Sequence, residues 1–156
     1  MSAEIDKLDD IDREILLRAP AIVALLAAIS DDGEVSKSEK SESVKLAHLR
    51  TYTSKDILHN FYKEVDKVFE GYFDEEALKM PEGKEAREEY LEDRLTDLNQ
   101  VLPKLNKIYA NELILSLKSF SRHVFKSNAG YLEFFVLPIF LNKIDFETFN
   151  PKIGGQ

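Results

Sequence analysis

Apolar residues recur every three or four positions along most of the chain, which is the spacing that places them on one face of a helix. The clearest stripes are Ile57, Phe61, Val65, Val68 and Tyr72, then Leu91, Leu95, Leu98 and Leu102, then Ala110, Leu113, Leu117, Phe120 and Val124. No segment shows the strict apolar–polar alternation that is typical of a half-buried strand. The pattern therefore predicts an all-α fold.

Capping residues and prolines divide the first third of this pattern into separate helices. We expect a first helix that ends near Arg18 and a second that begins with Pro20, because proline is well tolerated in the first turn of a helix. Ser36 and Glu39 have the spacing of a capping box, which predicts a third helix over residues 37–52.

The later breaks are less regular. Residues 74–80 can form a short extra turn, and Pro, Glu and Gly at 81–83 mark a clear break. Pro103 either kinks a helix or begins a new one. Residues 131–141 are apolar almost all round, so we expect them to form a closing helix in the core. The expected architecture is a compact single-domain bundle of about six to seven helices.

Length and composition fit one soluble domain. The chain has 156 residues, of which 44% are hydrophobic and 32% are charged. We expect a single domain over residues 1–150 with a flexible tail over 151–156.

The formal net charge of -8 argues against a nucleic-acid binder and against attraction to anionic membranes. The absence of cysteine excludes disulfides and thiolate metal sites. With an acidic N-terminus and no apolar run long enough for a membrane span, a cytoplasmic protein is expected.

One acidic turn carries the clearest chemical signal. Asp31, Asp32, Gly33, Glu34 and Glu39 follow an apolar run directly, and oxygen-rich turns of this kind bind hard cations. If Gly33 takes the sixth position of an EF-hand loop, Glu39 falls on the twelfth, where a bidentate glutamate is required.

The first half of such a loop is missing. Ala28 and Ser30 occupy the first and third positions, where carboxylates are needed, so a complete EF-hand is not expected. Two interpretations stay open: a partial cation site formed by Asp31, Asp32, Glu34 and Glu39, or a plain connector in which Gly33 supplies a turn and Glu39 caps a helix.

Residues 21–39, an apolar helix followed by Asp-Asp-Gly and then by a helix opened with a glutamate, resemble the TerB-like family of tellurite-resistance proteins. The resemblance implies an all-helical cytoplasmic protein in metal-stress response, with divalent cations bound by Asp31, Asp32, Glu34 and Glu39. Because the ligands are all oxygens, Ca²⁺ is favoured, with Mg²⁺ or Mn²⁺ as alternatives. The family's second acidic turn has only a partial counterpart at residues 126–133, which contain no aspartate.

The remaining polar residues offer little for catalysis. Asp56 and His59 share a helix face and, with Glu42 or Glu64, offer a weak candidate for a transition-metal site. No nucleophile elbow, phosphate-binding glycine loop or zinc-binding histidine motif is present. We therefore expect a protein without enzymatic activity, and keep a small enzyme with an Asp/His pair as an alternative.

The charged residues near position 90 indicate an exposed helix face. Acidic residues within 88–93 lie beside Arg87 and Arg94, which is typical of a solvated helix face.

Aromatic residues concentrate near the C-terminus: Phe120, Phe125, Tyr131, Phe134, Phe135, Phe140, Phe146 and Phe149. They indicate core packing or an apolar surface for a protein partner or a second copy. The favoured function is cation binding and stress response through a partner, with a metal-free interaction adaptor as the alternative.

Overall fold

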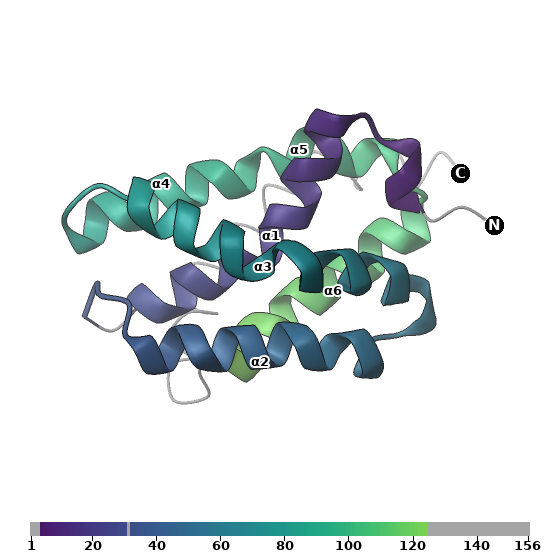
Figure 1. Cartoon of the computed structure of the whole chain (residues 1–156). Coiled ribbons are helices and arrows are strands. Elements are labelled where there is room, and N and C mark those ends of the chain that lie inside the picture. Colours follow the sequence, from purple (N-terminus) through teal and green to yellow (C-terminus); the bar gives the residue numbers. More distant parts are fainter. Residues whose placement is uncertain (1–3, 31, 125–156) are drawn as a thin grey trace.

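The computed structural model describes residues 4–30 and 32–124, and these residues form an all-helical bundle (Figure 1). Its long helices are α1 (Asp10–Ile29), α2 (Lys37–Thr53), α3 (His59–Lys79), α4 (Lys84–Thr96) and α6 (Lys107–Val124). Its short elements are α5 (Leu98–Val101) and the 3-10 turns η1 (Glu4–Lys7), η2 (Asp56–Leu58) and η3 (Leu102–Lys104). The predicted all-α class is confirmed, and the described residues contain no strand. None of the described helices is both long and apolar enough to cross a membrane.

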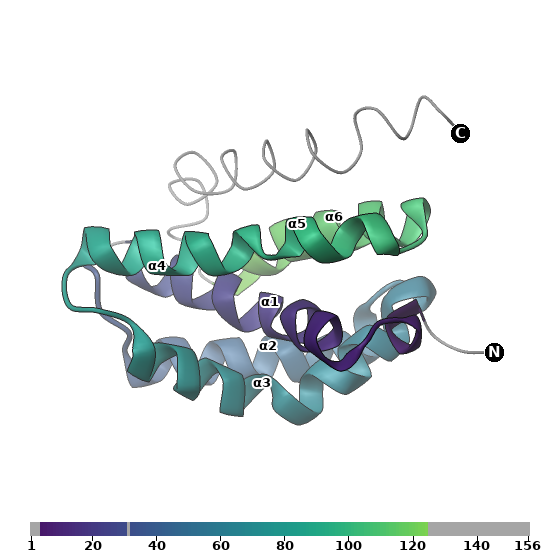
Figure 2. The same ribbon diagram turned by 90° about the horizontal axis from the view of Figure 1, so that it is seen from above.

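Helix α1 is the centre of the bundle. Figure 2 shows it between a layer formed by α2 and α3 and a layer formed by α4, α5 and α6. Every residue from Leu16 to Ile29 is buried, as expected for a helix that is apolar all round. Both layers therefore pack on the same central helix.

The predicted division at Pro20 is wrong, because α1 continues through it. Proline removes one helical hydrogen bond and costs about 3 kcal/mol in a helix interior. In α1, however, Pro20 and the residues on both sides of it are buried, and α1 packs against α3, α4 and α6. This continuous burial offsets the local cost and keeps the two segments in one helix.

Helix α3 is longer than predicted and begins later. Residues 74–80, predicted as a separate turn, fall almost entirely within α3. At its start, η2 precedes the helix, and Ile57, predicted on the buried face, is 40% exposed whereas Phe61 is fully buried. The tighter winding of a 3-10 turn rotates Ile57 away from the face that the α-helical spacing assigned to it.

The stripe predicted over α4, α5 and η3 is confirmed, since Leu91, Leu95, Leu98 and Leu102 are all buried. Pro103 lies in η3, and α6 begins beyond it at Lys107. The side-chain oxygen of Asn106, just before α6, accepts a 2.9 Å hydrogen bond from the backbone N–H of Ile108. The predicted count of six to seven helices is not confirmed, because segments predicted as separate helices merge in α1 and α3. The predicted helix over residues 131–141 lies outside the described residues.

Candidate functional site

The acidic turn follows the C-terminal end of α1. Gly33 has a φ of 82° and its backbone N–H donates to the Ile29 carbonyl at 3.0 Å. It therefore ends the helix in the left-handed conformation that glycine favours. The Asp32 carboxylate accepts a 2.9 Å hydrogen bond from the Glu34 backbone N–H, which tightens the turn. Asp31, one of the predicted ligands, lies outside the described residues.

Glu39, another predicted ligand, caps helix α2. Its carboxylate accepts a 2.7 Å hydrogen bond from the Ser36 backbone N–H, and the Ser36 hydroxyl accepts a 3.0 Å bond from the Glu39 backbone N–H. The predicted capping box is thus confirmed. The carboxylate that would have to be bidentate toward calcium already has one oxygen on its own helix terminus.

Helix α4 is tied to the same turn through Arg87. Its guanidinium donates to the carbonyl of Gly33 at 2.6 Å and to the carbonyl of Pro81 at 2.8 Å, and it lies 3.4 Å from the Glu34 carboxylate. The structure therefore places Asp32, Glu34 and Glu39 in one turn, each with a partner from the chain itself. Within residues 4–30 and 32–124, no group of three or more His, Asp or Glu side chains is arranged to hold a metal ion.

Gly33 also has no room for a side chain. A Cβ atom built there would lie 2.9 Å from the Cβ of Lys84. We expect Gly33→Ala to lower the free energy of unfolding by about 1–3 kcal/mol, because strain at positive φ and the close contact act together. Gly71→Ala in α3, where nothing lies within 4 Å of the new Cβ, is the matched control. It should raise the free energy of unfolding by about 0.5–1 kcal/mol. Urea denaturation measures the free energy of unfolding of both variants. Equal changes in the two variants would contradict the prediction.

The described histidines do not form the predicted metal site. His59 begins α3 directly after Asp56 and η2, but Glu64 pairs with Arg13 and Lys67, and Glu42 pairs with Lys45. His48 on α2 lies 3.1 Å from Asp66 on α3. That pair is exposed, with 59% of the His48 side chain open to solvent, so it is a surface contact.

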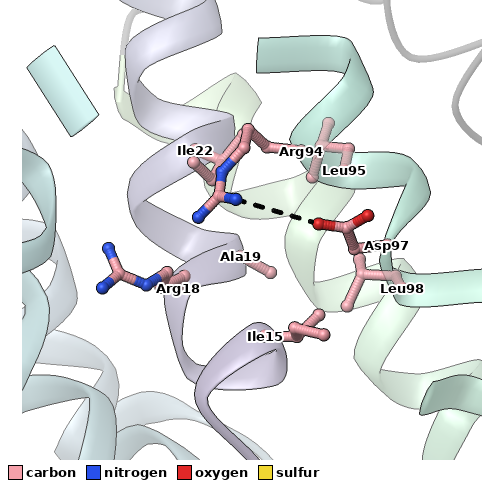
Figure 3. Close-up of a pocket in the computed structure, with 8 residues that line it drawn as sticks. All are labelled: Ile15, Arg18, Ala19, Ile22, Arg94, Leu95, Asp97 and Leu98. Atoms are coloured by element: carbon pink, nitrogen blue, oxygen red, sulfur yellow. Dashed lines mark ion pairs between the residues drawn. The ribbon is translucent and has the colours of Figure 1, made fainter. Parts of the chain in front are cut away.

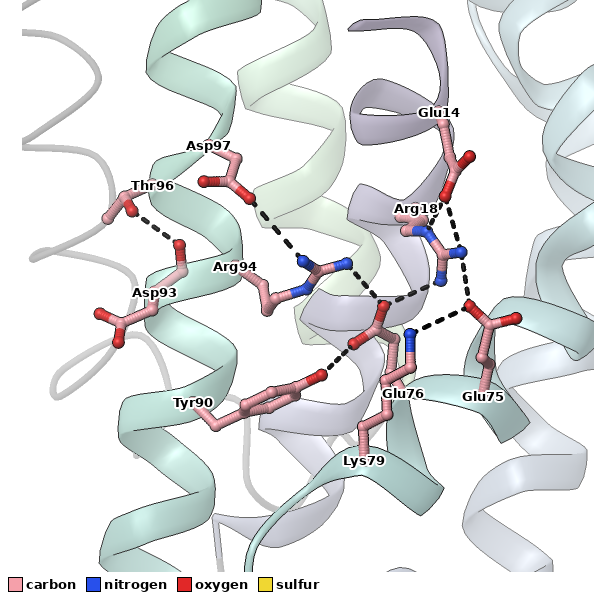
Figure 4. Close-up of polar contacts among 10 residues, drawn as sticks. All are labelled: Glu14, Arg18, Glu75, Glu76, Lys79, Tyr90, Asp93, Arg94, Thr96 and Asp97. Atoms are coloured by element: carbon pink, nitrogen blue, oxygen red, sulfur yellow. Dashed lines mark hydrogen bonds and ion pairs between the residues drawn. The ribbon is translucent and has the colours of Figure 1, made fainter. Parts of the chain in front are cut away.

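A buried carboxylate that sequence analysis did not single out joins three helices (Figure 4). Glu76 on α3 is completely buried. One of its oxygens accepts hydrogen bonds from Arg18 of α1 at 2.8 Å and Arg94 of α4 at 2.9 Å, and the other accepts from the Tyr90 hydroxyl at 2.8 Å. Removing a carboxylate from water costs several kcal/mol unless opposite charge and donors replace the water. Two guanidinium groups and a phenol supply both here.

Arg18 has further partners at the edge of this cluster. Its guanidinium pairs with Glu14 at 2.7 Å and with Glu75 at 2.5 Å, and lies 4.0 Å from the centre of the Tyr72 ring. These contacts hold the Arg18 guanidinium in place against α1, where only 8% of the residue is exposed. Together with Glu76 it forms a structural charge cluster that the three helices enclose.

The hollow beside this cluster is too small for a ligand other than water. It lies between α1 and the α4–α5 segment, lined in part by Ile15, Ile22 and Leu98, with Arg94 and Asp97 3.9 Å apart at its edge (Figure 3). Its free space is about 10 Å³, which corresponds to about one water molecule. The Nε atom of Arg94 is buried without a hydrogen-bond partner among the described residues.

A larger hollow of about 210 Å³ lies between the C-terminal end of α2 and helix α6. We call it the α2–α6 hollow. Its polar lining consists of four hydroxyl side chains, two cationic side chains and one carboxylate: Thr53, Ser54, Ser116, Ser119, Arg50, Lys55 and Glu112. Leu58 and Leu115 supply its apolar part.

Arg50 is held in a fixed position in the α2–α6 hollow. Its two terminal nitrogens donate to the hydroxyls of Ser116 and Ser119, both at 3.2 Å. Ser116 is in turn hydrogen-bonded at 2.6 Å to the hydroxyl of Tyr62, a completely buried residue of α3. The guanidinium also lies 5.6 Å from the centre of the Phe120 ring. These contacts fix the direction of a guanidinium that bridges α2 and α6.

Two other polar groups of this hollow are less constrained. Lys55 is paired with Glu112 at 3.0 Å, but 70% of its side chain is exposed. The Ser54 hydroxyl oxygen is buried and has no hydrogen-bond partner among the described residues. A buried hydroxyl without a partner is uncommon in folded proteins, and this oxygen is enclosed by the chain itself and does not open into the hollow.

No family model, curated protein or solved structure matches this chain. The TerB-like resemblance of residues 21–39 therefore remains a prediction, and the function has to be argued from the site itself.

Some of the missed residues carried a signal in the sequence. Glu76 continues the three-to-four spacing of the buried Phe69 and Phe73, and Arg18 lies at the start of the apolar run of α1. A charged residue at a core position calls for a partner of opposite charge, which here proves to be Glu76 for Arg18. Arg94, predicted on a solvated face, instead turns inward to the same carboxylate.

The cluster predicts how stability depends on pH. Burial and the hydrogen bond to Glu76 raise the pKa of Tyr90 to about 12. The stabilisation is therefore complete below the pKa of an unfolded tyrosine, near 10, and is lost as the pH rises toward 12, because the unfolded chain releases the proton first. We expect the free energy of unfolding of Tyr90→Phe to fall less steeply with pH than that of the wild type. For one proton the slope is at most about 1.4 kcal/mol per pH unit.

The check is the free energy of unfolding measured in urea from neutral to alkaline pH. Tyr52→Phe is the control, since Tyr52 is 73% exposed. The pKa values of Tyr62, Tyr72 and Tyr109 are also raised by burial, so a residual slope should persist in Tyr90→Phe. An unchanged slope in that variant would count against the assignment.

Proposed function

We propose that this chain is a non-enzymatic helical domain that binds a partner protein through the α2–α6 hollow. The observation that carries the proposal is the exposed leucine in the lining of this hollow. Leu115 lines the hollow and is 52% exposed. Leu49, which is 51% exposed, lies one helical turn before the lining residue Thr53. Exposed apolar side chains surrounded by polar groups at a hollow are typical of protein interaction sites, and Leu115 is such a side chain.

The rigidity of the surrounding structure supports the same function. Arg50 is fixed by hydrogen bonds to α6, and Leu58 beneath the hollow is only 2% exposed. A preformed surface loses little conformational entropy when a partner binds. Interface energy commonly concentrates in a few tryptophan, tyrosine and arginine side chains at the centre of a contact, and Arg50 in this hollow is one of these types.

The test compares two exposed apolar positions. Partners are captured from a lysate of the cells that produce the protein, and the purified partner is then titrated by calorimetry. Leu115→Asp should weaken binding by about thirtyfold or more, the effect of losing a central interface residue. Ile11→Asp, at a position that is 73% exposed on α1, should leave binding unchanged. Equal affinities for both variants and the wild type would refute this surface.

Cation binding at the acidic turn is a second candidate. Asp32 and Glu39 each accept a backbone hydrogen bond within the turn, whereas a carboxylate offers about four lone-pair positions, so both retain oxygens for a cation. Glu34, whose side chain is 75% exposed, lies in the same turn. On this proposal the domain binds Ca²⁺, or Mg²⁺ or Mn²⁺, and acts in a TerB-like stress response in the cytoplasm through its partner.

Thermal unfolding of metal-stripped protein separates cation binding from capping. If calcium binds, a hundredfold excess over the dissociation constant stabilises the native state by about 2.7 kcal/mol. That increment should disappear in Asp32→Asn. Ser36→Ala serves as the control, because it removes the hydroxyl that caps α2 and keeps every predicted ligand. Loss of such a cap costs about 0.5–2 kcal/mol. No stabilisation by any of the three cations would make the turn a helix connector only.

A further inference from the structure

We propose that the α2–α6 hollow recognises a single phosphorylated side chain of the partner protein. This inference rests on the proposed function, since it names the chemistry that the same surface reads. Arg50 and Lys55 supply positive charge, and the hydroxyl side chains of Thr53, Ser116 and Ser119 also line the hollow.

The size of the hollow selects a side-chain group. Sites for whole small molecules commonly enclose about 300–1,000 Å³. The α2–α6 hollow encloses about 210 Å³ and is open on one side, so it accommodates one end group while the rest of the ligand stays outside. A side chain that projects from a peptide has this form.

The donors suit a phosphoryl group. A phosphoserine carries about -1.5 to -2 charges at neutral pH and three strong acceptor oxygens. Arginine binds phosphate through the planar fork of its guanidinium, and here the hydroxyls of Ser116 and Ser119 already set the direction of that fork. Hydroxyl donors beside a guanidinium and an ammonium match an acceptor with several oxygens better than they match an apolar side chain.

The charge around the hollow limits the ligand to one phosphoryl group. The chain carries a formal net charge of -8, which opposes the close approach of nucleic acids and other polyanions. Within the hollow, Glu112 competes with the ligand for Lys55, to which it is paired at 3.0 Å. Phosphoryl binding would therefore have to displace or share this pair, and removal of the Glu112 charge should strengthen binding.

The apolar edge favours a peptide over free phosphate. Leu115 and the nearby Leu49 are about half exposed and would contact residues that flank the phosphorylated side chain. Free phosphate uses only the charged groups, so its affinity should be far lower than that of a phosphopeptide with apolar flanks.

The experiment titrates three probes into the full chain by NMR and calorimetry: inorganic phosphate, a short peptide with phosphoserine between leucines, and the same peptide with serine. The phosphopeptide should bind at least tenfold tighter than either of the others. Lys55→Gln should weaken it by about fivefold, the scale of an exposed ion pair, and Glu112→Gln should tighten it by a similar factor. Lys45→Gln, on α2 outside the hollow with 73% of its side chain exposed, is the control and should change nothing.

The outcomes separate the two levels of the proposal. Equal binding of both peptides, with Leu115→Asp weakening both, would overturn phosphoryl recognition and keep the interaction surface. Inorganic phosphate binding as tightly as the phosphopeptide would overturn recognition of a partner side chain. If no probe bound, or if Glu112→Gln bound the phosphopeptide more weakly than the wild type, the phosphoryl site would be overturned. The interaction surface would still be supported if Leu115→Asp lost the purified partner.

Discussion

Replacing Glu76 by glutamine should lower the free energy of unfolding by about 3–5 kcal/mol, the typical cost of removing one member of a buried ion pair. The substitution keeps the shape of the side chain and removes its charge. Arg18, of which 8% is exposed, and Arg94 would then face a neutral amide in the centre of the bundle. The amide oxygen can still accept from Arg18 and Arg94, and the amide N–H can donate to the Tyr90 hydroxyl oxygen, so the expected loss comes from the missing charge.

Glu75→Gln is the matched control for this experiment. Glu75 is the neighbouring residue and also pairs with Arg18, at 2.5 Å, but 46% of its side chain is exposed. An exposed pair contributes about 0–1 kcal/mol, so the control should lose no more than that. Urea denaturation with an unchanged slope against denaturant measures both variants. Similar losses for Glu75→Gln and Glu76→Gln would show that burial does not govern the strength of this cluster.

Removing the Phe69 side chain should cost about 3–5 kcal/mol, the range for truncating a large aromatic residue in a core. Phe69 is 2% exposed, and its ring centre lies 5.9 Å from that of Phe120 on α6 and 6.0 Å from that of Phe73. Phe69→Ala therefore leaves a cavity where α3 meets α6. The rigid neighbouring rings limit how far the core can collapse to fill it.

Leu78→Ala is the control for the Phe69 variant. Leu78 lies on the same helix but is 87% exposed. Surface substitutions of this kind commonly change stability by less than about 0.5 kcal/mol. In thermal and urea unfolding, the two variants should therefore differ by several kcal/mol. If Phe69→Ala behaved like Leu78→Ala, α3 would not pack against α6 through this residue.

Local signals in the sequence were reliable where one short segment determines its own geometry. The Ser36–Glu39 capping box and the turn at Gly33 follow from side-chain hydrogen bonding and backbone sterics within a few residues. The apolar stripe from Leu91 to Leu102 is likewise buried as predicted. Pro20 shows the limit of such signals, because long-range burial of α1 overrides the local preference to begin a helix there.

The candidate sites depend on contacts between residues far apart in the chain. Arg50 meets Ser116 across 66 positions, and Arg18 meets Glu76 across 58, so no local pattern pairs them. The acidic turn was predicted from composition, but composition did not reveal that Arg87, 54 residues after Gly33, would bind the turn. Three-dimensional packing, rather than motif spacing, determines which polar groups meet.

The central position of α1 has a consequence for how the molecule opens. Because α2 and α3 pack on one side of it and α4, α5 and α6 on the other, detachment of either layer would expose one side of this apolar helix and break the contacts between α2 and α6. The two layers should therefore exchange their amide protons as one cooperative unit, with the slowest exchange along α1, where release of a proton needs the whole bundle to unfold. Partial unfolding is then confined to the ends of the outer helices, which include the C-terminal end of α2 at the α2–α6 hollow.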